Sequence, residues 1–231
     1  MAETSHITLE SLGIEGFGVE DWKHHYGYDL NYSPIPEELI EMVGDDCPFW
    51  PDKKIRDTHM LTYVPSVIGG KQLTLRMFDD VMKNPTNGKP TKYHYLHADQ
   101  NEDDPIGTSA WILMVKECIP NSLGKPFDMQ KLLVYEPYSV PKMLHAAVSI
   151  VSYNFKYEKY LYFLDMAVQQ ALTGAKQTWC AEKAYSDFRC VVGCFGNHGL
   201  WANIQENIYF KDFNVNPITG LGLTVVYEDS E

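Results

Sequence analysis

Residues 139–155 read SVPKMLHAAVSIVSYNF, and this stretch carries the clearest helical signal in the chain. Apolar side chains recur at intervals of three and four residues, which is typical of a helix that buries one face. That face consists of Met143, Leu144, Ala147, Val148 and Val151. Ser139 is the expected N-cap residue. The pattern therefore predicts a helix packed along one side against a core.

Further helices are predicted on both sides of this stretch. Residues 157–174 repeat the same apolar pattern, and Gly174 would end the second helix. Residues 36–44 begin with Pro36 and end at Gly44, the expected left-handed cap. Residues 74–85 start at Thr74, a suitable N-cap residue, and end at a proline.

Short apolar or alternating runs predict strands throughout the chain. Three fall before the central helices, at residues 58–65, 91–98 and 109–120, and three after them, at residues 188–195, 207–215 and 220–228. No linker, repeat or low-complexity tract separates these segments. We expect a single α+β domain over residues 1–231, with interleaved helices and strands and a β-rich C-terminal third.

The composition excludes several classes of partner. The 231 residues include 45% apolar residues, enough for a large core, and their net charge is −12. A negative chain without a basic stripe repels phosphate groups, so we expect neither nucleic acid nor membrane as partner. The five cysteines are odd in number and thinly spread, and no signal peptide begins the chain. We therefore expect free thiols and a cytoplasmic protein, although delivery into a host cell stays open.

Cys47 lies in the segment GDDCPFWPDKK and is a candidate nucleophile. It follows a predicted helix end and two aspartates, Asp45 and Asp46, which disfavour a reactive thiolate. Two prolines after it indicate a tight turn, with Phe49 and Trp50 as its core anchors. The structural interpretation is favoured over the catalytic one.

His59 is the second catalytic candidate. Asp57 lies two residues before it, so on a strand both side chains would share one face, and Asp57 could orient a general base. The alternative is that one or both residues bond to the backbone where the strand begins.

Two other patterns resemble metal sites without completing one. Cys190, Cys194 and His198 are evenly spaced, but on a strand they would span about 26 Å and they lack a close fourth ligand. The acidic run from Asp99 lacks the glycine and glutamate of a calcium loop. We therefore expect no metal and no cofactor.

Residues 195–207, FGNHGLWANIQEN, are the predicted binding surface. Their glycines let the backbone turn sharply, so we expect a loop between strands, which is where recognition is usually found. The candidate ligand-binding residues are Asn197, His198, Trp201 and Asn203. A ring beside amides and an imidazole suits a sugar, a peptide or a protein surface. Whether Trp201 is surface or core stays open.

The segment CPFWPDKKIRDTHMLTYVP is similar to one that recurs in a family of uncharacterised proteins, mainly from bacteria that live inside amoebae. The resemblance continues through SAWILMVKECIPNS, YSVPKMLHAAV, TWCAEK and VVGCFGNHGL, and so spans most of the chain. It implies a shared scaffold that includes Cys47, Trp50, His59, Trp111 and Cys180, but no activity. The chain departs from the family at Leu123-Gly124, where an arginine is expected, and has a longer helical stretch before TWC.

A weaker likeness links the glycine-rich C-terminal stretch to C-type-lectin-like and formylglycine-generating folds. From these observations we expect a non-catalytic binding protein that recognises a protein, peptide or sugar through its C-terminal loops. The alternative is a hydrolase-like enzyme that uses Cys47 or His59.

Overall fold

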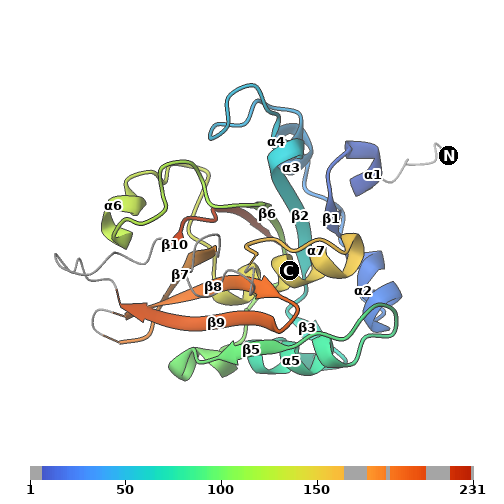
Figure 1. Ribbon diagram of the computed structural model, residues 1–231. Coiled ribbons are helices and arrows are strands. Elements are labelled where there is room, and N and C mark those ends of the chain that lie inside the picture. Colours follow the sequence, from blue (N-terminus) through green and yellow to red (C-terminus); the bar gives the residue numbers. More distant parts are fainter. Residues whose placement is uncertain (1–6, 164–175, 186–187, 207–218, 230–231) are drawn as a thin grey trace.

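The structure is a computed structural model that describes residues 7–163, 176–185, 188–206 and 219–229 (Figure 1). A long helix, α7 (Met143–Tyr157), lies in the middle of the molecule. It contacts strands of two separate β-sheets, one on each side. Helices and strands are mixed along the chain, which confirms the predicted α+β class.

The first sheet has the order β1-β2-β6-β11. Its strands are β1 (Gly16–Phe17), β2 (His59–Val64), β6 (Ala110–Val115) and β11 (Thr224–Glu228). β1 runs parallel to β2, whereas β2 and β11 are antiparallel to β6. Every residue of β2 and β6 is buried, as expected of central strands that are covered on both faces. These strands confirm three of the predicted ones.

The second sheet has the order β10-β7-β8-β9-β5. Its strands are β5 (Tyr93–Leu96), β7 (Gln177–Lys183), β8 (Phe188–Gly196), β9 (Gly199–Glu206) and β10 (Thr219–Gly220). β7, β8 and β9 form an antiparallel meander, and β5 and β10 pair in parallel at its two edges. β5 and β8 were predicted. The predicted strand at 207–215 lies outside the described residues.

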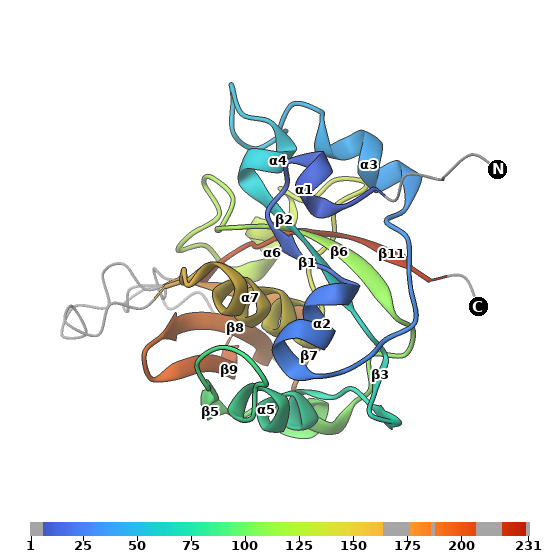
Figure 2. The same cartoon turned by 90° about the vertical axis from the view of Figure 1, so that its right-hand side faces the viewer.

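Helix α7 lies between the two sheets and is buried on all sides, whereas the sequence predicted a helix with one buried face. Figure 2 shows the helix between the strands of the first sheet and those of the second. From Met143 to Tyr153 every side chain is buried, so the helix has no exposed face. A helix buried on all sides belongs to the centre of a fold and not to its surface.

The N-terminus of α7 is capped differently from the prediction. Lys142 occupies the N-cap position, and the Glu182 carboxylate of β7 accepts the Met143 backbone N–H at 2.9 and 3.0 Å. Ser139, the predicted cap, instead pairs its backbone with Thr224 of β11. The carboxylate satisfies a free helix N–H and lies at the positive end of the helix dipole.

Shorter helices surround the sheets. They are α1 (Leu9–Leu12), α2 (Val19–Tyr26), α3 (Glu37–Val43), α4 (Ile55–Thr58), α5 (Leu75–Lys83) and α6 (Phe127–Lys131), with a 3₁₀ turn at Asp99–Asp103. A small hairpin joins β3 (Val67–Ile68) to β4 (Lys71–Gln72). Thr74 caps α5 as predicted, with its Oγ1 accepting the Met77 N–H at 3.1 Å.

Two predictions about helix ends were wrong. Gly44 ends α3 with a right-handed φ of −81°, so it is not the left-handed cap expected. The helix predicted over residues 157–174 does not begin there, because Glu158 adopts a left-handed φ of 54° and ends α7. Residues 159–163 are not helical, and the remainder of that prediction, residues 164–174, lies outside the described residues.

Candidate functional site

The predicted binding stretch is a β-hairpin more than a loop. β8 ends at Gly196 and β9 begins at Gly199, so only Asn197 and His198 form the turn. The expectation of a loop over residues 195–207 was wrong in this respect. Gly199 has a φ of 118° and lies against the Lys92 carbonyl, just before β5, where a Cβ would clash. The close pairing of β5 with β9 requires this glycine.

Side chains on β9 alternate between the core and the outside. Leu200 and Ala202 are fully buried, whereas Trp201 and Asn203 point to the opposite face and are half-buried. Trp201 is therefore not a core residue. The sequence left this question open, and the strand periodicity of β9 decides it.

Trp201 belongs to a group of partly exposed rings, which we call the ring cluster: His94, Tyr95, His198 and Trp201. The His94 ring is stacked on Trp201, with centroids 5.5 Å apart and planes 23° apart. Tyr95, which is 45% exposed, lies 6.1 Å from Trp201, and His198 lies 5.8 Å from His94. The cluster forms because β5 pairs with β9, which places Tyr95 opposite Trp201.

The two predicted asparagines have different surroundings. Asn197 Oδ1 accepts the Tyr160 hydroxyl at 2.9 Å, and both residues line a cavity of about 400 Å³ beside the end of α7. Asn203 lies on the same strand face as Trp201, and its Oδ1 accepts the Ile204 N–H at 2.7 Å. The structure thus brings His198, Trp201 and Asn203 to one hairpin face or its turn, while Asn197 faces the neighbouring cavity.

Cys47 lies in a closed turn at the edge of the first sheet. Its N–H donates to the Lys53 carbonyl at 2.7 Å, and its side chain is only 7% exposed. Phe49 anchors the turn on Tyr138, with ring centroids 4.9 Å apart. Within the described residues, no hydrogen bond joins the Cys47 thiol to an imidazole or a carboxylate. This environment is that of a packed thiol.

Asp57 does not share a strand face with His59, so that expectation was wrong. Asp57 lies in the short helix α4, where its Oδ2 accepts the Lys54 N–H at 3.1 Å and caps the helix start. His59 is the first residue of β2. The alternative correctly expected a bond from Asp57 to the backbone, but the bond caps the start of helix α4 and not the start of the strand.

His59 is completely buried, and its hydrogen bonds are satisfied. Burial lowers its pKa to about 4, although a hydrogen bond to the Ile55 backbone acts in the opposite direction. The Tyr138 hydroxyl lies 3.2 Å from Nε2 and Thr58 Oγ1 lies 2.8 Å from Nδ1. Thr58 Oγ1 donates to the Lys54 and Ile55 carbonyls, so it accepts the Nδ1–H, and Nε2 accepts the Tyr138 hydroxyl. The imidazole therefore has no spare lone pair for a substrate.

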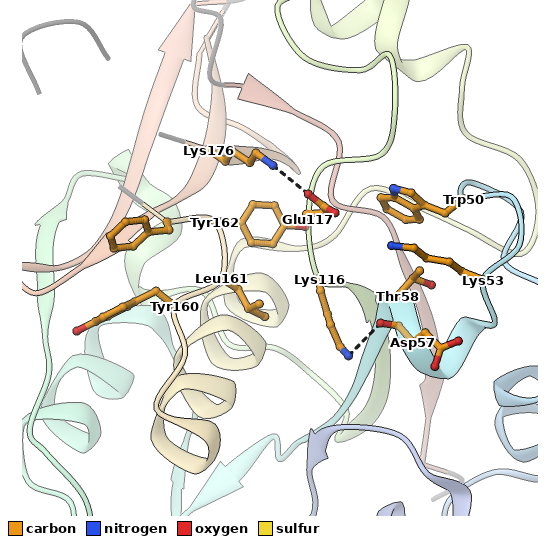
Figure 3. Close-up of a pocket in the computed structure, with 11 residues that line it drawn as sticks. Trp50, Lys53, Asp57, Thr58, Lys116, Glu117, Tyr160, Leu161, Tyr162 and Lys176 are labelled. Carbon is orange, nitrogen blue, oxygen red and sulfur yellow. Dashed lines mark hydrogen bonds and ion pairs between the residues drawn. The ribbon is translucent and has the colours of Figure 1, made fainter. Parts of the chain in front are cut away.

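A second cavity, with a volume of about 420 Å³, lies next to α4, whose residues Asp57 and Thr58 line it. We call it the lysine pocket and define it by Lys53, Lys116, Lys176, Trp50, Tyr160 and Phe163. Figure 3 shows these lysines, together with Glu117, reaching the pocket from separate segments. Tyr160 also lines the neighbouring cavity beside Asn197. No local sequence motif predicts this pocket, because successive lysines in it lie about sixty residues apart in the sequence.

The remaining motif candidates lie apart. Cys190 and Cys194 are in β8 and His198 is in the turn, with Cys190 facing Asn101 and Cys194 facing Gln177. In the described ranges, no three His, Cys, Asp or Glu side chains are grouped so as to hold a metal ion. None of the helices described has both the length and the apolar character needed to cross a membrane.

Comparison with known proteins adds no relative. No protein-family model, no curated protein and no solved structure matches the chain. The likeness to C-type-lectin-like folds therefore stays a prediction, and function must be argued from the two sites themselves.

Proposed function

We propose that this chain is a non-catalytic binding protein that recognises a carbohydrate through the ring cluster. The observation that carries this proposal is the half-buried Trp201, stacked on His94 at 5.5 Å and flanked by the exposed Tyr95. A rigid aromatic face offers an apolar platform with little entropy to lose on binding. The C–H face of a sugar ring fits such a platform.

Polar groups around the platform suit the hydroxyls of a sugar. A neutral imidazole offers one donor and one acceptor, and His94 and His198 are both exposed. The Asn203 carbonyl oxygen is already occupied by the Ile204 N–H, which leaves its NH₂ group as a donor. Hydroxyl groups both donate and accept, so they match this mixture of donors and acceptors.

A peptide or protein partner fits the same surface less well. A peptide could add a strand at the β5 edge, but the Tyr93 N–H there already donates to Asp79 of α5 at 3.0 Å. A stable protein interface uses about 20–30 residues on each side, which is far more than a cluster of four rings. These two features favour a small, ring-shaped ligand.

The surroundings of Cys47 and His59 support binding over hydrolysis. A nucleophile and its base must lie within hydrogen-bond reach and open into a cleft. Cys47 is buried in its turn, and both nitrogens of His59 have partners. Neither side chain lines the lysine pocket.

A glycan-binding assay tests the proposal. Purified protein would be applied to immobilised neutral mono- and oligosaccharides, and the best binder would then be titrated in solution. Trp201→Ala should weaken that binding tenfold or more, because the platform is lost. Tyr32→Ala removes an aromatic that is 59% exposed elsewhere and should change nothing.

Fluorescence supplies a second, independent readout. Trp22, Trp111 and Trp179 are buried, so Trp50 and Trp201 are the two tryptophans that report on the surface. The sugar should shift the emission of Trp50→Phe, which retains Trp201, but not that of Trp201→Phe. Absence of glycan binding, or unchanged binding by Trp201→Ala, would refute the proposal. Retention of a protein or peptide instead would assign the ring cluster to that partner.

A further inference from the structure

We propose that the lysine pocket is a separate binding site for a small organic anion, a carboxylate or a phosphate monoester attached to a flat ring. Three of the 19 basic residues of this acidic chain meet in this one cavity. Lys53 comes from the turn after Trp50, Lys116 follows β6, and Lys176 precedes β7. Only the tertiary fold places them together.

Lys116 supplies a fixed positive charge at one side of the pocket. Its ammonium group lies 2.6 Å from Glu15 and 3.3 Å from the Asp57 carbonyl, and its side chain is only 18% exposed. Glu15 is held as a carboxylate: burial raises its pKa, but hydrogen bonds from Lys116, Tyr153 and Lys159 prevail and lower it to about 2. The Lys116 ammonium group is therefore held in place, and its charge is already balanced by the Glu15 carboxylate.

Lys53 supplies a charge that is not balanced. Its ammonium group forms no ion pair within the described part of the chain, although its side chain lines the pocket. The backbone beneath it is fixed, because the Lys53 carbonyl accepts the Cys47 N–H at 2.7 Å. The Asp57 carboxylate also lines the pocket, but it accepts the Lys54 N–H and forms no ion pair with Lys53 in the part of the chain that the structure describes.

Glu117 marks the position of the ligand anion. Its carboxylate lies 2.9 Å from the Lys176 ammonium. In Figure 3, Lys53 and Lys176 extend toward the same space from opposite sides, and Glu117 lies between them. Glu117 is 49% exposed, so its carboxylate can move into water at little cost when another anion arrives. Glu117 thus acts as an internal competitor for the ligand.

The walls of the pocket determine the remainder of the ligand. Trp50 is half-buried and lies next to Lys53 in Figure 3, so an indole face is available beside an ammonium group. Tyr160 and Phe163, which is 42% exposed, also line the pocket, and their rings pack together with centroids 5.6 Å apart. A volume of about 420 Å³ falls within the range of small-molecule sites, which is roughly 300–1,000 Å³. The combination fits a flat apolar body that carries one acidic group.

Calorimetry with four simple probes tests the chemistry. Phenyl phosphate and benzoate carry a ring and an anion, benzamide carries the ring without the charge, and inorganic phosphate carries the charge without the ring. Both ring anions should bind at least tenfold more tightly than benzamide and phosphate, and their affinity should fall as salt is added. The stronger of the two identifies the phosphate or the carboxylate class. Equal binding of benzamide, equal binding of inorganic phosphate, or no binding at millimolar concentrations would overturn the proposal.

Charge variants test the residues. Lys53→Gln and Lys176→Gln should each weaken binding of the preferred probe about tenfold, whereas Glu117→Gln should strengthen it several-fold by removing the competitor. Lys71→Gln changes an exposed lysine on β4 and serves as the matched control. Trp201→Ala should leave this affinity unchanged, which separates the pocket from the ring cluster. Weaker binding by Glu117→Gln, or unchanged binding by both lysine variants, would contradict the assignment.

Discussion

The histidines around α7 and those of the ring cluster are the same residue type in opposite surroundings. His145 and His59 are buried, and burial lowers their pKa values to about 3 and about 4. His94 and His198 are exposed and pack against other rings. The first pair is part of the interior, whereas the second is accessible to a ligand. The difference teaches that burial, and not residue type, decides which histidines can bind or react.

The largest expected effect separates two tryptophans of the second sheet. Trp179 of β7 is 2% exposed and lies 5.7 Å from the Phe127 ring, so Trp179→Ala should cost about 3 kcal/mol or more. Trp201→Ala, on β9, should cost less than about 1 kcal/mol. Urea unfolding of both variants measures this. Similar losses of unfolding free energy for the two variants would show that Trp201 is packed as tightly as the interior residue Trp179.

Acid should destabilise the interior through its histidines. In the unfolded chain an imidazole binds a proton below about pH 6.5, whereas folded His59 stays neutral until the pH approaches 4. The unfolded state binds more protons in this window, so stability is lost as the pH falls. Between pH 7 and pH 5 we expect a loss of about 2 kcal/mol from each buried histidine.

Single substitutions test which residues cause this pH dependence of stability. His145→Gln should reduce the slope of unfolding free energy against pH, because burial lowers the pKa of this histidine to about 3. Glu182 acts in the opposite direction, because burial raises its pKa, and Glu182→Gln should make the acid loss steeper. A slope that His145→Gln leaves unchanged would contradict the assignment of the acid loss to the buried histidines.

The smallest expected effect concerns Cys47. Cys47→Ala should cost about 1 kcal/mol, because a packed side chain is shortened in a turn. All five cysteines are buried and none is in a disulfide within the described structure, so native protein should react slowly with an alkylating agent. In denaturant without reductant, mass spectrometry should find five labels. Rapid labelling of Cys47 in the native protein would show that its thiol is accessible and not packed.

Local pattern was sufficient for elements whose own side chains show a clear period or a cap residue. Thr74 and the apolar face that follows it predicted α5, and the alternation in TKYHYLHA predicted β5. Local pattern failed where a distant residue intervenes. Ser139 had the right side chain for a cap, but Glu182 supplies the bond because β7 crosses the N-terminus of α7.

The candidate sites divide in the same way. Trp201, His198 and Asn203 were found in the sequence, because an aromatic beside turn residues is a local signal. Their partners His94 and Tyr95 lie about a hundred residues earlier and join them only through the pairing of β5 with β9. Their alternating rings were visible, but nothing in the sequence linked the two segments.

The sequence by itself determined the α+β class, the central helix and the strands β2, β5, β6, β8 and β11, because side-chain periodicity records which face of an element is buried. Only the tertiary structure decided that α7 is buried on all sides, since that requires two sheets to close around it. The tertiary structure also assembled the lysine pocket from Lys53, Lys116 and Lys176. Charges brought together by folding leave no pattern in sequence, because their spacing along the chain is set by the length of the intervening elements.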